Sequence, residues 1–408
     1  MINSAISAEA ELSGTVELET AGGLLNTKNN KLELLFTPEL KLTLPMDSEL
    51  TAIGRVRSDG YGELTPSSRS DIRLRELYLS TEVGDGFITI GKQQIVWGKA
   101  DGIKVLDVVN PQEFREFILD GFEASRIPLW SVNVEMPLAG LDMQLIWLPD
   151  QTYHSFAEHG ATFALTSPLL LPSVPAGVQV NQLPVEKPNR FLADSDVGMR
   201  LSTFWKGWDL SLNYLYHFDD TPVLFRQLGM GAAGAVANIS PRYQRSHLIG
   251  GTFGSAFGNL TLRGEAGYSL GKRLSTNSLV DADGVVQTDE FSYVLGFDWF
   301  GFSDALISLQ LFQTWVPKYE TGVIRDRLDS SASLLIRHNF KNDTIVGETL
   351  WIHNGNRGDG LIRPKIEYVW SDAITVWLGA DLFYGNRKGL YGQFDKQDRI
   401  VAGIEIGL

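Results

Sequence analysis

Apolar and polar side chains alternate along this chain in blocks of about ten residues, a length typical of membrane β-strands, and the last block runs to the final residue. In that block Ile400, Ile404 and Leu408 share one face of an expected strand, while Arg399 and Glu405 share the other. In an outer-membrane barrel the apolar face meets lipid and the polar face meets a hydrated lumen. The alternation therefore predicts a transmembrane antiparallel β-barrel.

About eighteen segments follow the same two-residue period and end at turn-forming residues. Each is expected to be one strand of the wall, so residues 11–408 are expected to form a single barrel domain behind a periplasmic tail at residues 1–10. The expected strands are 11–20, 31–44, 48–58, 72–83, 86–96, 127–138, 140–148, 196–205, 208–217, 244–255, 258–270, 289–300, 304–316, 330–340, 343–353, 363–371, 373–384 and 397–408.

The connections between these segments alternate strictly between short and long. Outer-membrane barrels have short periplasmic turns and long external loops, and an even number of strands leaves both termini in the periplasm. The short connections are 45–47, 84–85, 139, 206–207, 256–257, 301–303, 341–342 and 372. The long ones are 59–71, 97–126, 149–195, 218–243, 271–288, 317–329, 354–362 and 385–396.

A soluble β-sandwich would show the same alternation, with its apolar face turned inward. The order of short and long connections, the size of the chain and aromatic residues near the strand ends favour the membrane. These aromatics are Trp147, Tyr216, Tyr268, Trp299, Trp315, Trp351, Trp370 and Tyr384. We therefore expect the bacterial outer membrane, with its lipids around the wall.

Composition excludes several other classes of protein. The chain has no cysteine, which rules out disulfides, thiolate metal sites and covalent haem. Its net charge of −14 argues against a nucleic-acid partner. The six histidines do not show metal-ligand spacing, although His154 and His159 lie in one loop. No basic start and apolar run mark a signal peptide. We expect no cofactor, no metal and no enzymatic activity.

The polar faces of the expected strands carry charges of both signs. Such charges either form a transverse field that orients polar solutes or only rigidify the wall through salt bridges. Acids outnumber bases, which favours cations or neutral solutes. The faces of 72–83, 244–255 and 343–353 stay ambiguous, because simple alternation does not assign Arg73, Arg75, His247 and Glu348 clearly to the polar face. The lumen candidates are Glu17, Glu33, Lys41, Arg55, Arg57, Glu76, Glu135, Arg200, Arg263, Glu265, Asp298, Arg337, Glu367, Asp381 and Glu405.

One stretch carries a motif. It comprises Gly91-Lys92-Gln93, Trp97-Gly98, Asp101, Asp107 and Asn110-Pro111, followed by Arg126 and Pro128. It resembles the signature of an uncharacterised proteobacterial outer-membrane β-barrel family, which reads Gly-Arg-Gln, Trp-Gly, Asp and then Asp-x-x-Asn-Pro, with Lys92 in place of the arginine. More loosely it is similar to alginate-export-type porins. The resemblance implies an envelope channel that works with inner-membrane exporters of the RND type.

The connection 97–126 is unusually apolar for an external loop, which suggests that it folds into the barrel. Asn110 is expected to cap a helix that starts at Pro111 and includes 112–119. The segment either constricts the pore or is only anchored to the wall by its charges. The constriction or anchor candidates are Lys92, Gln93, Trp97, Asp101, Lys104, Asp107, Asn110, Arg115, Glu116 and Arg126.

The connection 149–195 contains five prolines and cannot be part of the wall. It is either a lid or plug, or a proline-stiffened external loop. The function that fits best is a monomeric outer-membrane channel, porin-like or an export pore, with a loop-constricted lumen. The alternatives are a component of lipid or hydrophobic-compound transport with an RND-type exporter, and a non-conducting barrel that docks a periplasmic or surface partner.

Overall fold

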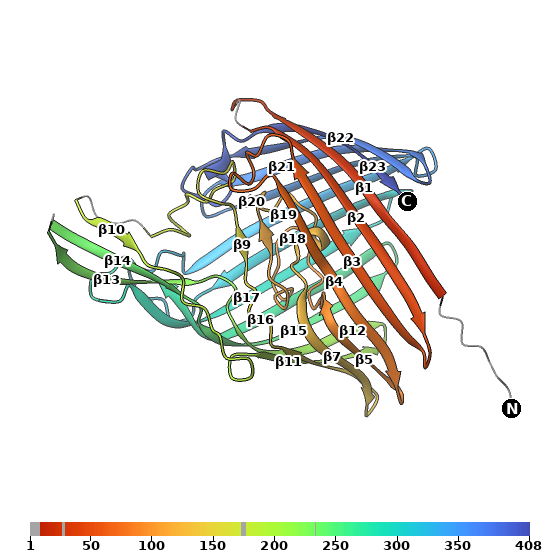
Figure 1. Ribbon diagram of the computed structural model, residues 1–408, viewed down its shortest axis with the longest axis horizontal. Coiled ribbons are helices and arrows are strands. Elements are labelled where there is room, and N and C mark those ends of the chain that lie inside the picture. Colours follow the sequence, from red (N-terminus) through yellow and green to blue (C-terminus); the bar gives the residue numbers. More distant parts are fainter. Residues whose placement is uncertain (1–8, 27–28, 173–176, 233) are drawn as a thin grey trace.

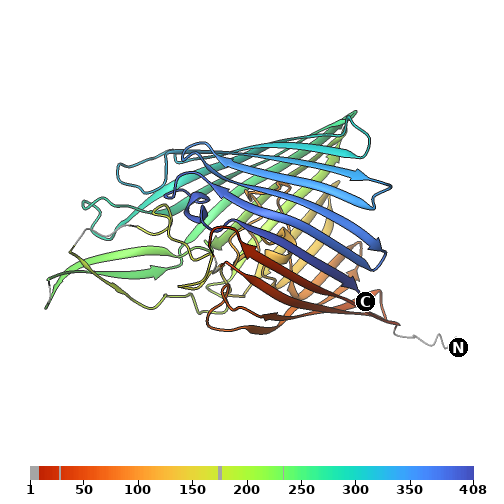
Figure 2. The same cartoon turned by 90° about the horizontal axis from the view of Figure 1, so that it is seen from above.

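The computed structural model describes residues 9–26, 29–172, 177–232 and 234–408. Eighteen strands of these residues form one antiparallel sheet, closed because β1 pairs with both β2 and β23. Figures 1 and 2 show the resulting barrel, with the start of β1 and the end of β23 at one side. The strands are β1 (Glu9–Gly23), β2 (Lys31–Leu44), β3 (Ser48–Asp59), β4 (Ser70–Val83), β5 (Gly86–Gln93), β7 (Leu129–Leu138), β8 (Leu141–Leu148), β11 (Asp196–Trp205), β12 (Trp208–Phe218), β15 (Arg245–Phe257), β16 (Leu260–Ser275), β17 (Val285–Trp299), β18 (Ala305–Trp315), β19 (Leu328–Phe340), β20 (Ile345–Asn354), β21 (Asp359–Ser371), β22 (Ile374–Tyr384) and β23 (Arg399–Gly407).

The predicted fold class is confirmed, and each expected strand corresponds to one strand of the wall. The predicted tail 1–10 lies outside the described residues except for Glu9 and Ala10, which already belong to β1. The largest consequence of a boundary error is at β5. It was expected to reach residue 96 but ends at Gln93, because the chain then turns inward and buries Ile95 and Trp97.

The short turns depend on residues with positive φ. Ala139 and Gly140 have φ of 53° and 84°, and Lys206 and Gly207 have φ of 49° and 87°. Two consecutive positive φ values are what a two-residue type I′ hairpin requires, since its twist matches that of the strands. Tight turns of this kind connect the strands at the end of the barrel where the sequence predicted the periplasmic side.

Exposed apolar side chains cover the outer face of the wall. Leu295, Phe297 and Trp299 alternate along β17, and each is 37% to 39% exposed. The residue between the last two, Asp298, is buried on the opposite face. This separation of hydrocarbon from charge matches a wall that meets lipid outside and polar groups inside.

A β-bulge resolves the ambiguity of the strand 72–83. Ile53 pairs with Glu76 while Gly54 pairs with Leu74, so Arg75 has no partner on β3. The extra residue shifts the alternation by one. As a result Arg73 and Glu76 both face the lumen, although they are three residues apart.

The other two ambiguous strands have different explanations. His247 of β15 faces outward, where its Nδ1 lies 2.9 Å from the Tyr214 hydroxyl. Glu348 of β20 faces inward and lies opposite Arg337. Leu350 and Ile352 share that inner face, because an inserted loop packs against them.

The loops hold further elements that the sequence did not predict. The strands β10 (Gln179–Gln182), β13 (Val223–Gly231) and β14 (Gly234–Arg242) form a small sheet that projects beyond the wall (Figure 1). The two-residue strands β6 (Glu113–Phe114) and β9 (Ser155–Phe156) pair in parallel. The helices are α1 (Phe122–Ser125) and the 3-10 helix η1 (Gly392–Phe394). None of the helices in the described residues is long and apolar enough to cross a membrane.

Replacing Leu295 by Arg should destabilise the barrel by about 2–4 kcal/mol, because a charge near the middle of the lipid-facing wall loses its hydration. The neighbouring change Ser292→Arg, on the inner face, is the matched control and should cost far less. Urea unfolding in liposomes, followed by tryptophan fluorescence, measures both. Equal losses for the two variants would contradict the assignment of the faces.

Candidate functional site

The chain between β5 and β7 folds into the barrel in two parts. Residues 94–110, here called the first lobe, lie against the inner wall from β8 to β20. Trp97 lies against Gly198 of β11, and Leu106 lies against Gly250 of β15 and Gly267 of β16. A Cβ atom at any of these glycines would come within 2.9 Å of the loop side chain, so the missing side chains make room for the lobe.

Polar side chains of the wall bind the backbone of the first lobe. One carboxylate oxygen of Glu265 accepts the N–H of Ala100 at 2.6 Å, and the other accepts the N–H of Leu106 at 3.0 Å. Arg263 pairs with Asp101 of the lobe and with Asp298 of the wall. These contacts satisfy backbone groups that are buried away from water. Glu265 and Arg263 were predicted as lumen charges, and here both bind the loop.

Apolar contacts seal the same interface. The lobe buries Ile95, Trp97, Leu106 and Val109 against inward side chains of four wall strands. The wall residues are Leu129, Ile146, Leu148, Leu215 and Leu248.

The base of the loop is tied by Asn110, but not as a helix cap. Its Oδ1 accepts the N–H of Ile95 at 2.6 Å, and its Nδ2 donates to the carbonyl of Ile127 at 3.0 Å. The predicted helix over 112–119 is wrong. The segment begins with the paired strand β6, and the helix α1 comes later. Its apolar residues find partners in other loops, so they need no helical face.

Asp107 forms a second tie at this base. It accepts from Arg126 at 2.7 Å and from Lys104 at 2.9 Å, so three of the predicted residues do meet. Lys104 also donates to Gln112 at 2.8 Å. Charge pairs within the loop fix its shape independently of the wall.

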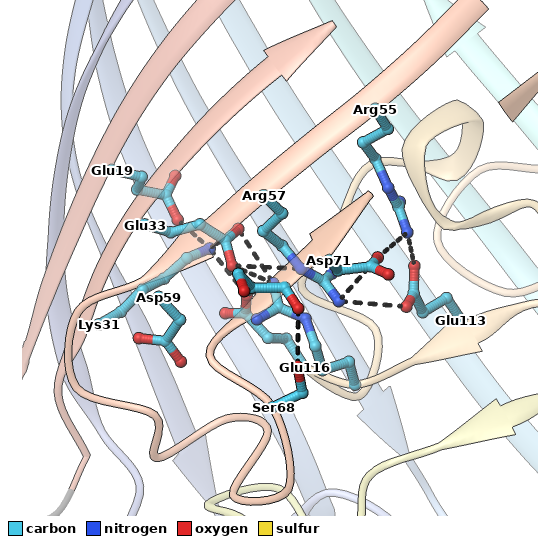
Figure 3. A network of polar contacts seen from close by, with 12 residues as sticks. Glu19, Lys31, Glu33, Arg55, Arg57, Asp59, Ser68, Asp71, Glu113 and Glu116 are labelled. Atoms are coloured by element: carbon cyan, nitrogen blue, oxygen red, sulfur yellow. Dashed lines mark hydrogen bonds and ion pairs between the residues drawn. The ribbon is translucent and has the colours of Figure 1, made fainter. Parts of the chain in front are cut away.

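Residues 111–126, here called the second lobe, cross to the opposite wall and are held there by a network of ion pairs (Figure 3). Glu116 is 1% exposed and lies 2.7 Å from Lys31 of β2, 2.8 Å from Arg399 of β23 and 2.8 Å from Arg115. Arg115 also lies 2.7 Å from Glu33. Because these charges are buried, removing one partner would leave the others uncompensated.

Glu113 is the other anchor of the second lobe. It lies 2.7 Å from Arg55 and 3.2 Å from Arg73 (Figure 3 shows the Arg55 contact). Burial alone would raise the pKa of Glu113, but Arg55, Arg57 and Arg73 together lower it to about 2. The carboxylate therefore stays charged at any ordinary pH.

The long loop 149–195 packs on the second lobe where it is described. Phe114 stacks on Phe156 at 5.5 Å, and Phe117 and Phe163 both contact Phe394. The backbone N–H of Gln112 donates to His154 Nδ1 at 2.8 Å. Burial lowers the pKa of His154 to about 3, so this histidine is neutral. Part of the loop thus lies inside the barrel, as a plug would.

The register locates the predicted charges. All of the lumen candidates lie on the face opposite the exposed apolar side chains, and Lys41, Glu135 and Glu367 make only local contacts there. Lys92 is the exception among the loop anchors. It pairs with the exposed Trp130, so it faces outward and is not part of a constriction. Its neighbour Gln93 faces inward and is buried.

A cavity of about 630 Å³ lies between the two lobes and the wall from β12 to β20. Its lining includes residues that the sequence analysis missed, because they sit at strand ends and in loops where alternation gives no face. Asp219 lies 3.6 Å from Lys272, and Glu290 lies 2.6 Å from Arg325. The acidic lining residues are Asp107, Asp120, Asp219, Asp220, Glu290, Asp326 and Asp329, and the basic ones are Lys104, Lys272, Arg273 and Arg325.

No group of three or more His, Asp or Glu side chains in the described residues is arranged to hold a metal ion. The arrangement as a whole is a cavity beside an inserted loop, with charges of both signs along its walls. Chemically it can bind and pass polar molecules that fit the cavity.

Comparison with known proteins supports this architecture. Residues 47–402 match the family described as "Protein of unknown function (DUF1302)". A search of the curated proteins gave no match. The chain is similar to OpdK of Pseudomonas aeruginosa, solved with vanillate, at 12% identity over 98% of each chain and a TM-score of 0.55. It is also similar to OccAB2 of Acinetobacter baumannii, at 10% identity over 98% of each chain and a TM-score of 0.56.

A third similar structure is OccK2 (OpdF) of Pseudomonas aeruginosa in complex with glucuronate, at 10% identity over 98% of each chain and a TM-score of 0.55. At such identities the likeness shows the fold alone. It supports the predicted outer-membrane location and an outer-membrane barrel family, whereas the motif from Gly91 to Pro128 stays a prediction.

The Glu113 anchor should make the second lobe sensitive to acid. Since the folded pKa is about 2, below the usual value near 4.3, its stabilisation is complete above about pH 4.3 and is lost as the pH falls toward 2. Single-channel current through the wild type should therefore become noisier over this range. Glu113→Gln should show that noise already at pH 7. Identical pH profiles for the two proteins would contradict the anchor.

Proposed function

The chain belongs to the DUF1302 family, and we propose that it is a porin-like channel that passes small polar solutes across the bacterial outer membrane. In this proposal the solutes move along the barrel axis, through the cavity and past the two lobes. The observation that carries the proposal is a cavity of about 630 Å³ inside a closed barrel, with charged side chains of both signs in its lining. Its volume lies within the range of about 300–1,000 Å³ that is usual for small-molecule sites.

The lobes supply the constriction in this proposal. The first lobe is bound to the wall at Glu265 and Arg263, and the second at Lys31 and Arg399. Loops fixed on opposite walls narrow the lumen permanently, whereas a loop fixed on one side could swing aside. A fixed constriction selects solutes by size and charge.

The charge preference of the channel depends on which charged side chains of the wall already form ion pairs with the loop. Arg55, Lys31 and Arg399 each lie within 2.8 Å of a carboxylate of the second lobe, so their charge is compensated. The cavity lining has seven acidic side chains and four basic ones, and some of them pair with each other. Two similar barrels were solved with the carboxylates vanillate and glucuronate. For this chain the acidic excess instead supports cationic or neutral solutes.

Transport of hydrophobic compounds, together with an RND-type exporter, is the second candidate. One observation favours it: residues 70–76 of β4 pair with β3 but not with β5, which leaves an unpaired strand edge in the wall. A docking barrel that conducts nothing is the third possibility, and the conductance measurement below separates it from a channel.

Purified protein in planar bilayers should give unitary currents, and a KCl gradient should give a reversal potential that reports a preference for K⁺ over Cl⁻. The reason is the acidic excess along the cavity. A folded barrel that carries no current would refute the channel, and a Cl⁻ preference would refute the selectivity.

Asp219→Asn should reduce the cation preference, with the permeability ratio falling by about twofold, because one lining carboxylate is removed next to Lys272. The matched control is Asp343→Asn, at an exposed short turn far from the cavity. Reversal potentials at low salt measure both variants, since screening is weakest there. A shift of equal size in the control would show that the effect is not local.

A further inference from the structure

The wall has an unpaired edge on β4. β4 pairs with β3 from Ser48 and Thr81 up to Ser58 and Ser70, but its pairing with β5 stops at Leu77 and Lys92. Residues 70–76 therefore have a neighbouring strand on one side only, over about 20 Å of strand. Among the described residues no backbone hydrogen bond joins this edge to another segment.

The edge lies at a height where the outside of the barrel is apolar. Val56 of β3 pairs with Ile72, and these outward side chains are 37% and 80% exposed. Leu74 is 43% exposed on the same face. Unpaired backbone groups at a lipid-facing height are costly, because hydrocarbon offers them no hydrogen bond. The edge therefore needs a cover or an occupant.

Two cations stand at this edge with backbone carbonyls as their hydrogen-bond partners. Lys92 Nζ donates to the carbonyl of Leu74 at 2.9 Å, and Arg75 Nη1 donates to the carbonyl of Ala124 at 3.1 Å. Asp150, which follows β8, already accepts the N–H of Trp130 and two hydrogen bonds from Thr152. The site thus offers positive charge beside exposed hydrocarbon.

The short helix α1 separates this edge from the interior. Arg75 donates to the carbonyls of both Glu123 and Ala124, which holds α1 against β4. The last residue of α1, Ser125, is buried and lines the cavity, as does Asp120 just before the helix. Helix α1 therefore lies between the edge and the cavity.

Exposure of the inward side chains is consistent with an opening here. Arg55 and Arg73 lie directly opposite each other on β3 and β4, and both reach Glu113. Arg55 is 12% exposed, whereas Arg73, one strand nearer to the edge, is 44% exposed.

We propose that the edge of β4 and helix α1 form a lateral opening, through which amphiphiles with one anionic group and an apolar chain pass between the outer leaflet and the cavity. Lys92 and Arg75 bind the anionic group. Ile72, Leu74 and Trp130 contact the apolar chain, in continuity with the lipid-facing wall. The opening is a second route, separate from the solute route along the barrel axis.

Binding is tested with 11-(dansylamino)undecanoate and the protein in lipid nanodiscs. The probe should bind saturably, and Lys92→Gln and Arg75→Gln should each weaken binding about tenfold, because each removes a charge-assisted contact. Arg337→Gln, an inward change on β19, is the matched control and should leave affinity unchanged. Lys92→Arg should restore binding. Unchanged affinity in both Gln variants, or equal binding of the uncharged amide of the probe, would overturn the proposal.

The route is tested by photolabelling, with dodecanoate that carries a terminal diazirine added to the nanodiscs. Mass spectrometry should find adducts at residues 70–76 and at cavity residues such as Ile118 and Leu169. Because the chain has no cysteine, Arg75→Cys and Ala124→Cys can be bridged by a bis-maleimide. Compared with the same double variant left unbridged, which also lacks Arg75, the bridged protein should lose the cavity adducts and keep those at the edge.

Cavity adducts that persist in the bridged protein would show that the probe enters along the barrel axis, and adducts spread evenly over the outer wall would show no opening. Either result overturns the lateral route. Neither measurement depends on ion current. The lateral route can therefore be refuted while the channel proposal holds, and the channel can be refuted while the lateral route holds.

Discussion

Hydrogen bonding of the backbone inside hydrocarbon is the constraint on which this structure depends. A strand that crosses the membrane must pair on both sides, and the barrel meets this demand by joining β1 to β23. Pleating then sends alternate side chains to lipid and to the lumen. The polar inner face is therefore a consequence of closure, and it provides the hydrogen-bonding groups that the inserted loop uses.

The inserted loop turns part of that wet inner face into a dry interface. Glu116 is 1% exposed, so its carboxylate and its three basic neighbours are stable there only as ion pairs with one another. Those neighbours come from β2, β23 and the loop itself. The wall and the second lobe are thus electrostatically one unit, which is why the constriction is expected to stay in place while solutes pass.

Local patterns predicted the wall, because a two-residue period is a property of the strand itself. They did not predict the loop, because its conformation depends on contacts with residues far away in the sequence. Phe117 packs on Phe394, and Glu116 forms an ion pair with Arg399. The orientation of Lys92 was missed for a similar reason. The motif suggested a role in the lumen, whereas the pairing with Trp130 turns the side chain outward. A single bulge at Arg75 likewise escaped the pattern, since no residue type marks it.

The unpaired edge of β4 departs from the same constraint, that backbone groups inside hydrocarbon must be hydrogen-bonded. Seven residues of β4 pair on one side only, at a height where the outer face of the wall is apolar. An outward lysine beside them adds a second cost, which falls when an anionic group lies next to it. Two costs at one place on the wall are removed together by one kind of occupant, an anionic amphiphile. Such an occupant would stabilise both the unpaired edge and the outward lysine, which is the physical reason to look for lipid-like molecules here and for polar solutes in the lumen.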